Sequence, residues 1–286
     1  MNTPRLRFAP SPTGSPHIGN IRTAVFDYLY ARHTGGTFIL RVEDTDRTRY
    51  QEGSLHEMMK GLRWMGMQWD EGPEAGGECG PYFQSERLDI YKKYAQQLID
   101  EGKAYYCYCT KERLEKMREA QMAAKQPPGY DRRCRDLTQA EREVLQAENP
   151  NPVIRFKMKS EGTTEFDDMV RGTVSFRNEL EDDFIMIKAD GFPTYHFASI
   201  IDDHFMQITH VVRGEEWISS APKHLQLYEA FGWTPPVFAH PPLILDERGK
   251  KLSKRSDTAT TFAYYVESGY LPDAMLNFLA TMGWSS

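Results

Sequence analysis

The stretch RFAPSPTGSPHIGN, residues 7–20, places three prolines, two glycines and His17 directly before a segment with helical periodicity. The first N–H groups of a helix have no internal partners, and the helix dipole adds roughly half a positive charge there, so this position attracts anions. Prolines fix the backbone of the turn, Gly14 and Gly19 leave room for a bulky ligand, and His17 adds a hydrogen-bond donor. The stretch predicts a phosphate-binding turn; the alternative is an ordinary turn in which His17 only caps the helix.

A second basic element lies far along the chain, in KKLSKR, residues 250–255, where four of the six residues are Lys or Arg. A loop of this kind can lie over a triphosphate and stabilise the charge that develops on a leaving pyrophosphate. A solvated basic turn is the alternative. The turn in residues 7–20 lacks both the G-x-G-x-x-G fingerprint and the Walker motif. Two anion-binding elements on one sheet therefore predict a nucleotide substrate, but neither a dinucleotide nor a P-loop site.

Three of the four cysteines have a spacing that is typical of metal sites. Cys107 and Cys109 form a C-x-C pair, and Cys134 follows about two dozen residues later. Thiolates arranged in this way can bind one zinc ion tetrahedrally, together with a fourth ligand. The alternative is three reduced cysteines that only pack.

Length and composition are those of a globular protein, with 286 residues of which 40% are hydrophobic and 27% charged. No run approaches the ~18 apolar residues that a membrane span requires, and the N-terminus lacks the apolar core of a secretory signal. Four cysteines in a chain of this length do not make a disulfide framework. A reduced, cytoplasmic protein is expected. Because the net charge is −6, a nucleic-acid partner would need a local basic face.

The order of the predicted elements indicates an α/β protein. Residues 5–9 alternate as a strand, a helix begins at Pro16 or His17 and ends at Gly35 and Gly36, and residues 37–44 form a second strand. Such a strand–helix–strand unit predicts parallel strands. Further helices are predicted over 53–65, between a cap at Ser85 and an end at Gly102, after a cap at Thr110, and after the capping box of Thr138 and Glu141. The second half of the chain is predicted to contain strands over 153–158 and 183–190, a helix over 194–205, a strand that runs into a loop within 208–217, a helix over 221–231, a strand over 241–249 and helices over the last forty residues.

Five separated stretches resemble bacterial-type glutamyl-tRNA synthetases of class I: RFAPSPTGSPHIGN, FILRVEDTDRTRY, GPYFQSERLDIYKKYAQQLIDEGKAYYCYC, DGFPTYHFASIIDDHFMQITHVVRGEEW and KKLSKRSD. PSPTGSPHIGN is similar to the HIGH-type signature of that class, and KLSKR to its KMSKS-type loop. The resemblance covers nearly the whole chain. It departs at Asn20, where the histidine motif ends in His, and at Ser199, where relatives often have an amide.

The resemblance implies a Rossmann-like parallel sheet with helices on both faces, interrupted by an α+β insertion that binds the tRNA acceptor end. The expected limits are 1–104 and 194–241 for the two halves of the catalytic domain, 105–193 for the insertion, and 242–286 for the KMSKS-type loop and the start of a helical region that contacts the tRNA stem. A full synthetase would continue after Ser286 into an anticodon-binding part.

The implied activity is ATP-dependent ligation of L-glutamate to tRNA(Glu) through glutamyl-adenylate, with release of AMP and pyrophosphate. Mg²⁺ would arrive with ATP, held mainly by phosphates and waters. Attack of a carboxylate on the α-phosphorus needs no nucleophile from the protein, in agreement with the absence of a Ser-His-Asp or Cys-His signature. A cytoplasmic monomer is expected.

The resemblance also implies roles for particular residues. His17 and Lys254 are the expected catalytic residues. The expected ATP contacts are Pro10, Ser11, Gly14, His17, Gly19, Asn20, Trp217, Lys251, Ser253, Lys254 and Arg255. The expected glutamate contacts are Arg7, Ser11, Glu43, Tyr195, Ser199 and Arg213, with arginines on the carboxylates and Glu43 on the ammonium. If zinc is bound, its expected ligands are Cys107, Cys109, Cys134 and, as in some relatives, Tyr130.

Each of these residues also has an ordinary structural explanation. Arg7 would be a surface arginine, Arg213 one half of a salt bridge, Glu43 a solvated acid at a strand end, and Trp217 a core residue. Without the resemblance, the structural explanation would be preferred for each of these residues.

Three other functions compete with that of a full synthetase. A glutamyl-queuosine tRNA(Asp) synthetase has a similar length, although the long loop EGPEAGGECGPYFQSER and the stretch RGEEW favour the full synthetase. A small-molecule nucleotidyltransferase would have no need of residues 105–193. A non-catalytic binding paralogue would be expected to lose His17 or Lys254, and both are present.

Overall fold

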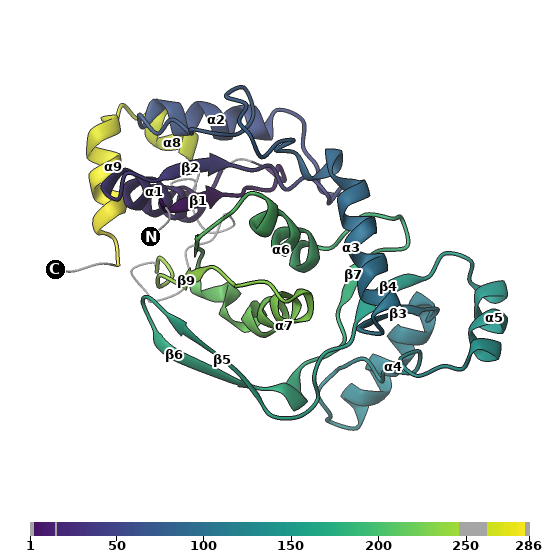
Figure 1. Cartoon of the computed structure of the whole chain (residues 1–286). Coiled ribbons are helices and arrows are strands. Elements are labelled where there is room, and N and C mark those ends of the chain that lie inside the picture. The colour runs from purple at the N-terminus through teal and green to yellow at the C-terminus, as the bar shows by residue number, and fades with distance from the viewer. Residues whose placement is uncertain (1–2, 15, 246–261, 284–286) are drawn as a thin grey trace.

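The computed structural model describes residues 3–14, 16–245 and 262–283, and its described part is built around a mixed six-stranded sheet (Figure 1). The strand order is β2-β1-β8-β9-β5-β6. All neighbours are parallel except the last pair, β5 and β6, which form an antiparallel hairpin. The strands are β1 (Arg5–Phe8), β2 (Thr37–Leu40), β5 (Thr163–Asp168), β6 (Gly172–Arg177), β8 (His210–Val212) and β9 (Val237–Ala239). Mostly parallel strands flanked by helices confirm the predicted α/β fold.

The first unit, β1–α1–β2, forms as its local sequence predicts. Ile21, Ala24 and Val25 of helix α1 (Ile18–His33) are buried in the core beside β1 and β2. It ends where Gly35 takes a φ of +66°, a conformation that favours glycine. Three more helices pack into this core: α2 (Ser54–Trp64), α8 (Phe262–Glu267) and α9 (Pro272–Thr281).

A second hydrophobic core lies between three helices, one from before the insertion and two from after it. It contains buried side chains from α3 (Leu88–Asp100), α6 (Tyr195–Phe205) and α7 (Ala221–Phe231). The buried face of α3 consists of Tyr91, Ala95 and Leu98, at helical spacing. No helix in the described ranges is both long and apolar enough to cross a lipid bilayer.

The insertion lies at the end of the molecule opposite to α9 (Figure 1). A three-stranded antiparallel sheet of β3 (Ala104–Cys107), β4 (Val153–Phe156) and β7 (Ile185–Ile187) carries α4 (Lys111–Ala123) and α5 (Gln139–Glu148). Thr110 caps α4, and the capping box opens α5, as predicted. The sequence did not predict the β5–β6 hairpin, which leaves the insertion and pairs with β9 of the main sheet. The limits 105–193 stay a prediction.

Two predicted features are wrong. Ser85 does not cap α3, because its N–H and hydroxyl donate to Asp44 at 2.8 and 2.6 Å, within a short 3₁₀ helix (Gln84–Glu86). The strand expected over 241–249 is absent from residues 241–245, and a strand lies earlier instead, at Val237–Ala239. Residues 246–249 of that prediction lie outside the described residues. Prolines at 241 and 242 offer no N–H to a neighbouring strand. Two further 3₁₀ helices span Asn178–Leu180 and Glu215–Ser220.

A buried carboxylate, Asp202 on α6, connects α6 to α3. It accepts hydrogen bonds from Gln84 Nε2 at 2.9 Å, Arg87 Nε at 2.7 Å and the Tyr91 hydroxyl at 2.8 Å. Asp202 is fully buried, so these donors replace its lost hydration. This cluster fixes α6, which carries two of the predicted glutamate contacts, Tyr195 and Ser199.

We expect Tyr91→Phe to lower the free energy of unfolding by about 1–3 kcal/mol, because it removes a donor from a buried carboxylate. Tyr94→Phe on the same helix is the control, since the Tyr94 hydroxyl makes no hydrogen bond to a described residue. That control should change the free energy of unfolding by less than about 0.5 kcal/mol. Urea denaturation measures both, and equal effects would contradict this role of Asp202.

Candidate active site

The candidate site lies where the chain leaves two neighbouring strands in opposite directions. β1 and β8 are adjacent, with Leu6 opposite His210, but β1 leads to β2 on one side and β8 leads to β9 on the other. In open α/β sheets, ligands bind at the carboxyl ends of the strands at such a point. The predicted turn follows β1, and Arg213 follows β8, so the fold brings these two distant segments to the same edge.

The helix cap, one of the two explanations predicted for the histidine turn, is confirmed. His17 is the N-cap of α1, and its Nδ1 accepts the N–H of Gly19 at 3.0 Å. The neutral ring therefore carries its proton on Nε2 and keeps a donor there. Gly14 takes a φ of +131° and is held to α2 through hydrogen bonds with Ser54 of 2.6 and 3.1 Å. The cap joins Nδ1 of His17 to the Gly19 amide, and phosphate binding by this turn stays a prediction.

Of the other residues expected to contact ATP, the structure describes some and not others. The carbonyl of Pro10 accepts the N–H of Glu43 at 2.9 Å, Ser11 is exposed beside it, and Asn20 is exposed at the start of α1. Trp217 is 39% exposed, so it is not a core residue, and its ring lies 4.7 Å from that of Tyr195. Four further expected contacts lie outside the described residues: Lys251, Ser253, Lys254 and Arg255.

Arg7 is buried rather than on the surface and belongs to a charged cluster. Its Nε donates to Asp203 at 3.0 Å, and Arg41 donates to the same carboxylate at 2.6 Å. Although burial raises it, the two guanidinium groups hold the pKa of Asp203 below its usual range. Sequence analysis did not single out Arg41, and its position inside the otherwise apolar run FILRV was the available signal.

Glu43 is also buried, not solvated as a strand-end acid would be. It accepts a hydrogen bond from Arg41 at 3.1 Å. Burial raises the pKa of Glu43 to about 7, against the opposing effects of Arg41 and Arg7. The site therefore holds an acid that a cationic group would favour in its charged form.

Arg213 has no salt bridge with any described residue, so the structural alternative for it is wrong. Its Nε donates to His240 at 2.9 Å, and its Nη1 lies 3.0 Å from Nδ1 of His224. Its Nη2 is buried and makes no hydrogen bond within the described ranges. The side chain is only 5% exposed, so it is a nearly buried cation that contacts two imidazoles and no carboxylate.

Tyr195 and Ser199 face this region from α6. The Tyr195 ring lies 5.9 Å from that of His224, which contacts Arg213. One helical turn later, the Ser199 hydroxyl is buried and makes no hydrogen bond to a described residue. Asp203 follows four residues after Ser199, on the same helix face. The structure thus brings Arg7, Tyr195 and Arg213 into one neighbourhood.

The three predicted metal-binding cysteines come together in the insertion. The sulfur atoms of Cys107, Cys109 and Cys134 all lie within 4.8 Å of one another. The Tyr130 hydroxyl lies 3.2 Å from the Cys107 sulfur and 3.7 Å from that of Cys109. Hydrogen bonds from the other two thiols lower the pKa of Cys107, which favours a thiolate. Tetrahedral zinc with bonds of about 2.3 Å would need sulfurs about 3.8 Å apart, and the observed spacing is compatible with this.

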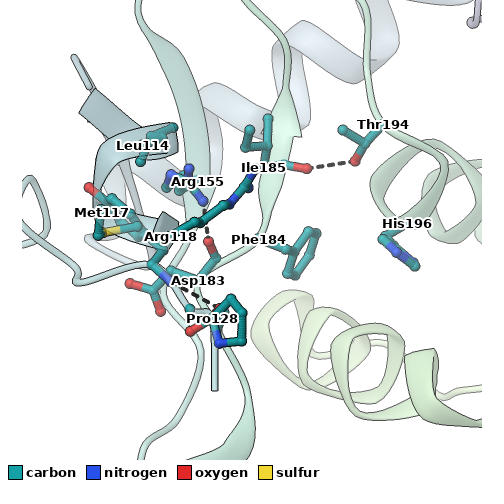
Figure 2. A pocket seen from close by; sticks show the side chains of 13 residues that line it. Leu114, Met117, Arg118, Pro128, Arg155, Asp183, Phe184, Ile185, Thr194 and His196 are labelled. Atoms are coloured by element: carbon teal, nitrogen blue, oxygen red, sulfur yellow. Dashed lines mark hydrogen bonds between the residues drawn. The ribbon is translucent and has the colours of Figure 1, made fainter. Parts of the chain in front are cut away.

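A cavity of about 330 Å³ separates the insertion from α6. Figure 2 shows Met117 and Arg118 of α4 on one side of it, and Phe184 with His196, from the start of α6, on the other. Sequence analysis missed His196, His224 and His240, because single histidines among apolar residues look like ordinary core residues.

The raised pKa of Glu43 makes the stability of the protein depend on pH. Between the ordinary value of 4.5 and about 7, the folded chain binds more protons at Glu43 than the unfolded chain does. Its contribution is therefore present at low pH and is lost as pH rises through this window. We expect the free energy of unfolding of the wild type, relative to Glu43→Gln, to fall by up to about 3 kcal/mol from pH 4.5 to pH 8.

Glu71→Gln is the matched control for that measurement. Despite burial, hydrogen bonds from Arg5 and Tyr82 lower the pKa of Glu71, so its titration lies below this window. Urea denaturation at several pH values supplies the comparison. A wild-type difference from Glu43→Gln that is constant from pH 4.5 to pH 8 would contradict the raised pKa.

Comparison with known proteins identifies the family. Residues 4–286 match the family described as tRNA synthetases class I (E and Q), catalytic domain. A glutamate–tRNA ligase of Dehalococcoides mccartyi is 56% identical over 284 residues, which cover 99% of this chain and 57% of that protein. One of Moorella thermoacetica is 52% identical, covering 100% and 58%.

The solved structures agree with this result. The crystal structure of a glutamate tRNA ligase from Elizabethkingia meningosepticum, in complex with its amino acid, superposes with a TM-score of 0.93 at 46% identity. The match covers 99% of this chain and 61% of that one, so the chain spans little more than half the length of the relatives it matches. With its motifs, its fold and these relatives in agreement, the chain belongs to the class I tRNA synthetases for glutamate and glutamine, of which it matches the catalytic domain.

Proposed function

We propose that this chain is the catalytic part of a cytoplasmic glutamate–tRNA ligase, which joins L-glutamate to tRNA(Glu) with ATP and Mg²⁺. The observation that carries the proposal is the convergence of Arg7, Arg213 and Glu43 at the switch point of the sheet. Two guanidinium groups and one acid complement a ligand with two carboxylates and one ammonium. The glutamate–tRNA ligases named above support the choice of amino acid.

In this proposal the hydroxyl groups around the arginines complete the glutamate site. Tyr195 and Ser11 donate to the ligand carboxylates, and the buried Ser199 hydroxyl supplies a further polar contact where relatives often have an amide. Glu43 binds the ammonium as a carboxylate. Because the ammonium favours the charged form, glutamate binding lowers the pKa of Glu43 and releases a proton near neutral pH.

The chemistry needs positioning and charge stabilisation rather than a protein nucleophile. In the first step, an α-carboxylate oxygen of glutamate forms a bond to the α-phosphorus of ATP, and the bond to the bridging oxygen of pyrophosphate breaks. In the second, a ribose hydroxyl of the tRNA end attacks the glutamyl carbonyl, and AMP leaves. Nε2 of His17 and the ammonium of Lys254 stabilise the negative charge on the phosphates, while Mg²⁺ binds mainly to phosphate oxygens and water.

The insertion and the last helices serve the tRNA in this proposal. Residues 105–193 bind the acceptor end, and residues 242–286 include the KMSKS-type loop and contact the stem. Of the three arginines in GYDRRCR, Arg132 and Arg135 bond to Glu181 and Asp183, whereas Arg133 is exposed and is the one suited to a phosphate.

A structural zinc ion fits the cysteine cluster. Cys107, Cys109 and Cys134 would supply thiolates and Tyr130 the fourth ligand. Arg155 lies over the Tyr130 ring, with its guanidinium carbon 3.9 Å from the centroid, and this cation–π contact helps to hold the ring beside the cysteines. The zinc would hold β3 to the loop after α4 and so stabilise the insertion.

Charging assays test the function directly. The chain, extended to its natural C-terminus, is incubated with ATP, radiolabelled L-glutamate and either tRNA(Glu) or tRNA(Asp). The proposal predicts glutamate on tRNA(Glu), with ATP–pyrophosphate exchange that depends on the tRNA. Glutamate on tRNA(Asp) alone would instead establish the glutamyl-queuosine activity, and exchange without either tRNA would indicate a small-molecule nucleotidyltransferase.

Lys254→Ala should reduce glutamyl-adenylate formation by at least tenfold, because it removes a positive charge from the leaving pyrophosphate. Lys250→Ala in the same basic stretch is the control and should retain most of the activity. ATP–pyrophosphate exchange with tRNA present measures the activity of both variants, and circular dichroism checks that both are folded. A Lys254→Ala rate near that of the wild type would remove this role.

Metal analysis of protein never exposed to a chelator should find one zinc per chain. We expect Cys134→Ser to bind less than a tenth of an equivalent, since it removes one of the ligands. Cys79→Ser is the matched control, because Cys79 lies outside the cluster, and it should keep its zinc. Wild-type protein with less than a tenth of an equivalent would end the zinc proposal.

A further inference from the structure

Five side chains from separate parts of the chain form one line of hydrogen bonds through Arg213. Nδ1 of His240 lies 2.6 Å from Asp168 Oδ2, and Nε2 of His240 accepts from Arg213 Nε at 2.9 Å. Nη1 of Arg213 lies 3.0 Å from Nδ1 of His224, whose Nε2 lies 3.1 Å from Nδ1 of His196. His196 ends the line at the cavity of Figure 2.

The guanidinium sets the direction of every bond in this line, because it can only donate. Both imidazole nitrogens beside it must accept. His240 therefore carries its proton on Nδ1, facing Asp168, and His224 carries its proton on Nε2, facing His196. Burial, reinforced by the charge of Arg213, lowers the pKa of His224 and of His240, so both rings stay neutral.

This arrangement leaves the charge of Arg213 unneutralised by any carboxylate in contact with it. Arg7 and Arg41 share Asp203, but Asp168 is separated from Arg213 by the His240 ring. Asp168 is further held by the N–H groups of Val170 and Arg171, at 2.9 and 3.0 Å, which keep it away from the guanidinium. Nη2 of Arg213 is buried and makes no hydrogen bond to any described residue.

We infer that Asp168 and His240 are positioning residues that hold Arg213 oriented and unpaired, so that a carboxylate of the amino-acid ligand becomes its anionic partner. The inference rests on the proposed function and assigns part of the discrimination between a carboxylate and an amide to two residues that need not touch the ligand. Asp168 ends β5 of the β5–β6 hairpin, and the pairing of Asp168 with Phe238 of β9 brings it to the main sheet.

Asp168→Asn tests the inference with almost no change in volume. The Asn amide can donate to Nδ1 of His240, which moves the ring proton to Nε2, where it faces the N–H of Arg213. Two donors then oppose each other, and the guanidinium must turn or lose its partner. We expect L-glutamate binding, measured by calorimetry, to weaken at least tenfold, while the affinity for ATP changes less than twofold.

Asp167→Asn is the matched control, because Asp167 precedes Asp168 on β5, is exposed and bonds only to Thr173 among the described residues. It should bind glutamate like the wild type. The double variant Asp168→Asn with His240→Gln should recover binding several-fold, since the Gln carbonyl accepts from Arg213 whatever stands at position 168. Should Asp168→Asn not fold, the pair His240→Gln and His240→Leu makes the same comparison, because only Gln keeps an acceptor.

Binding of L-glutamate, L-glutamine and L-isoglutamine distinguishes a loss of Arg213 orientation from a general defect of the binding site. Glutamine and isoglutamine each replace one carboxylate by an amide, so Arg213 should discriminate against one of them. In Asp168→Asn that discrimination should fall at least fivefold, whereas a purely structural defect would weaken all three ligands alike. If the wild type folds but binds no glutamate, both the proposed function and the inference fail. If the wild type binds and Asp168→Asn matches Asp167→Asn, only the inference is overturned.

Discussion

The distribution of buried charge around Arg213 is the constraint on which the site depends. Arg7, Arg41 and Arg87 each have a carboxylate of the Asp202–Asp203 pair as partner, whereas Arg213 has only imidazoles. A buried cation without an anion is unfavourable, because its lost hydration is not replaced by an opposite charge. A ligand carboxylate would remove that imbalance. The same feature that costs stability in the free protein thus favours binding of an acidic ligand.

The fold explains how such a site can be assembled from segments far apart in the sequence. Because β1, β8 and β9 are parallel, their carboxyl ends lie at the same edge of the sheet. The chain leaves β1 and β8 in opposite directions, and ligands of open α/β sheets bind in the crevice at such a point. Asp202 and Asp203 are consecutive residues of α6. Asp202 is bonded to Tyr91 of α3, and Asp203 is bonded to Arg7 of β1 and to Arg41, which directly follows β2. Packing of the second core and orientation of Arg7 are therefore linked through a single helix.

Local features of the sequence predicted local structure well. The cap at Thr110, the capping box at Thr138 and the helix after His17 all depend on residues within one turn. The prediction that Ser85 caps α3 was wrong, because Asp44, which is distant in sequence, accepts hydrogen bonds from the N–H and hydroxyl of Ser85. The line from Asp168 to His196 was not predictable, since its members come from five segments and only tertiary structure makes them neighbours. The roles of the site residues came from motif resemblance and stay proposals.

A structure of the protein with bound L-glutamate tests the central claim most directly. The account predicts that one carboxylate of the ligand lies within hydrogen-bond distance of Nη2 of Arg213, with His240 still accepting from Nε and Arg7 still bonded to Asp203. A complex in which Arg213 instead pairs with a carboxylate of the protein, and glutamate binds without contacting it, would contradict the account.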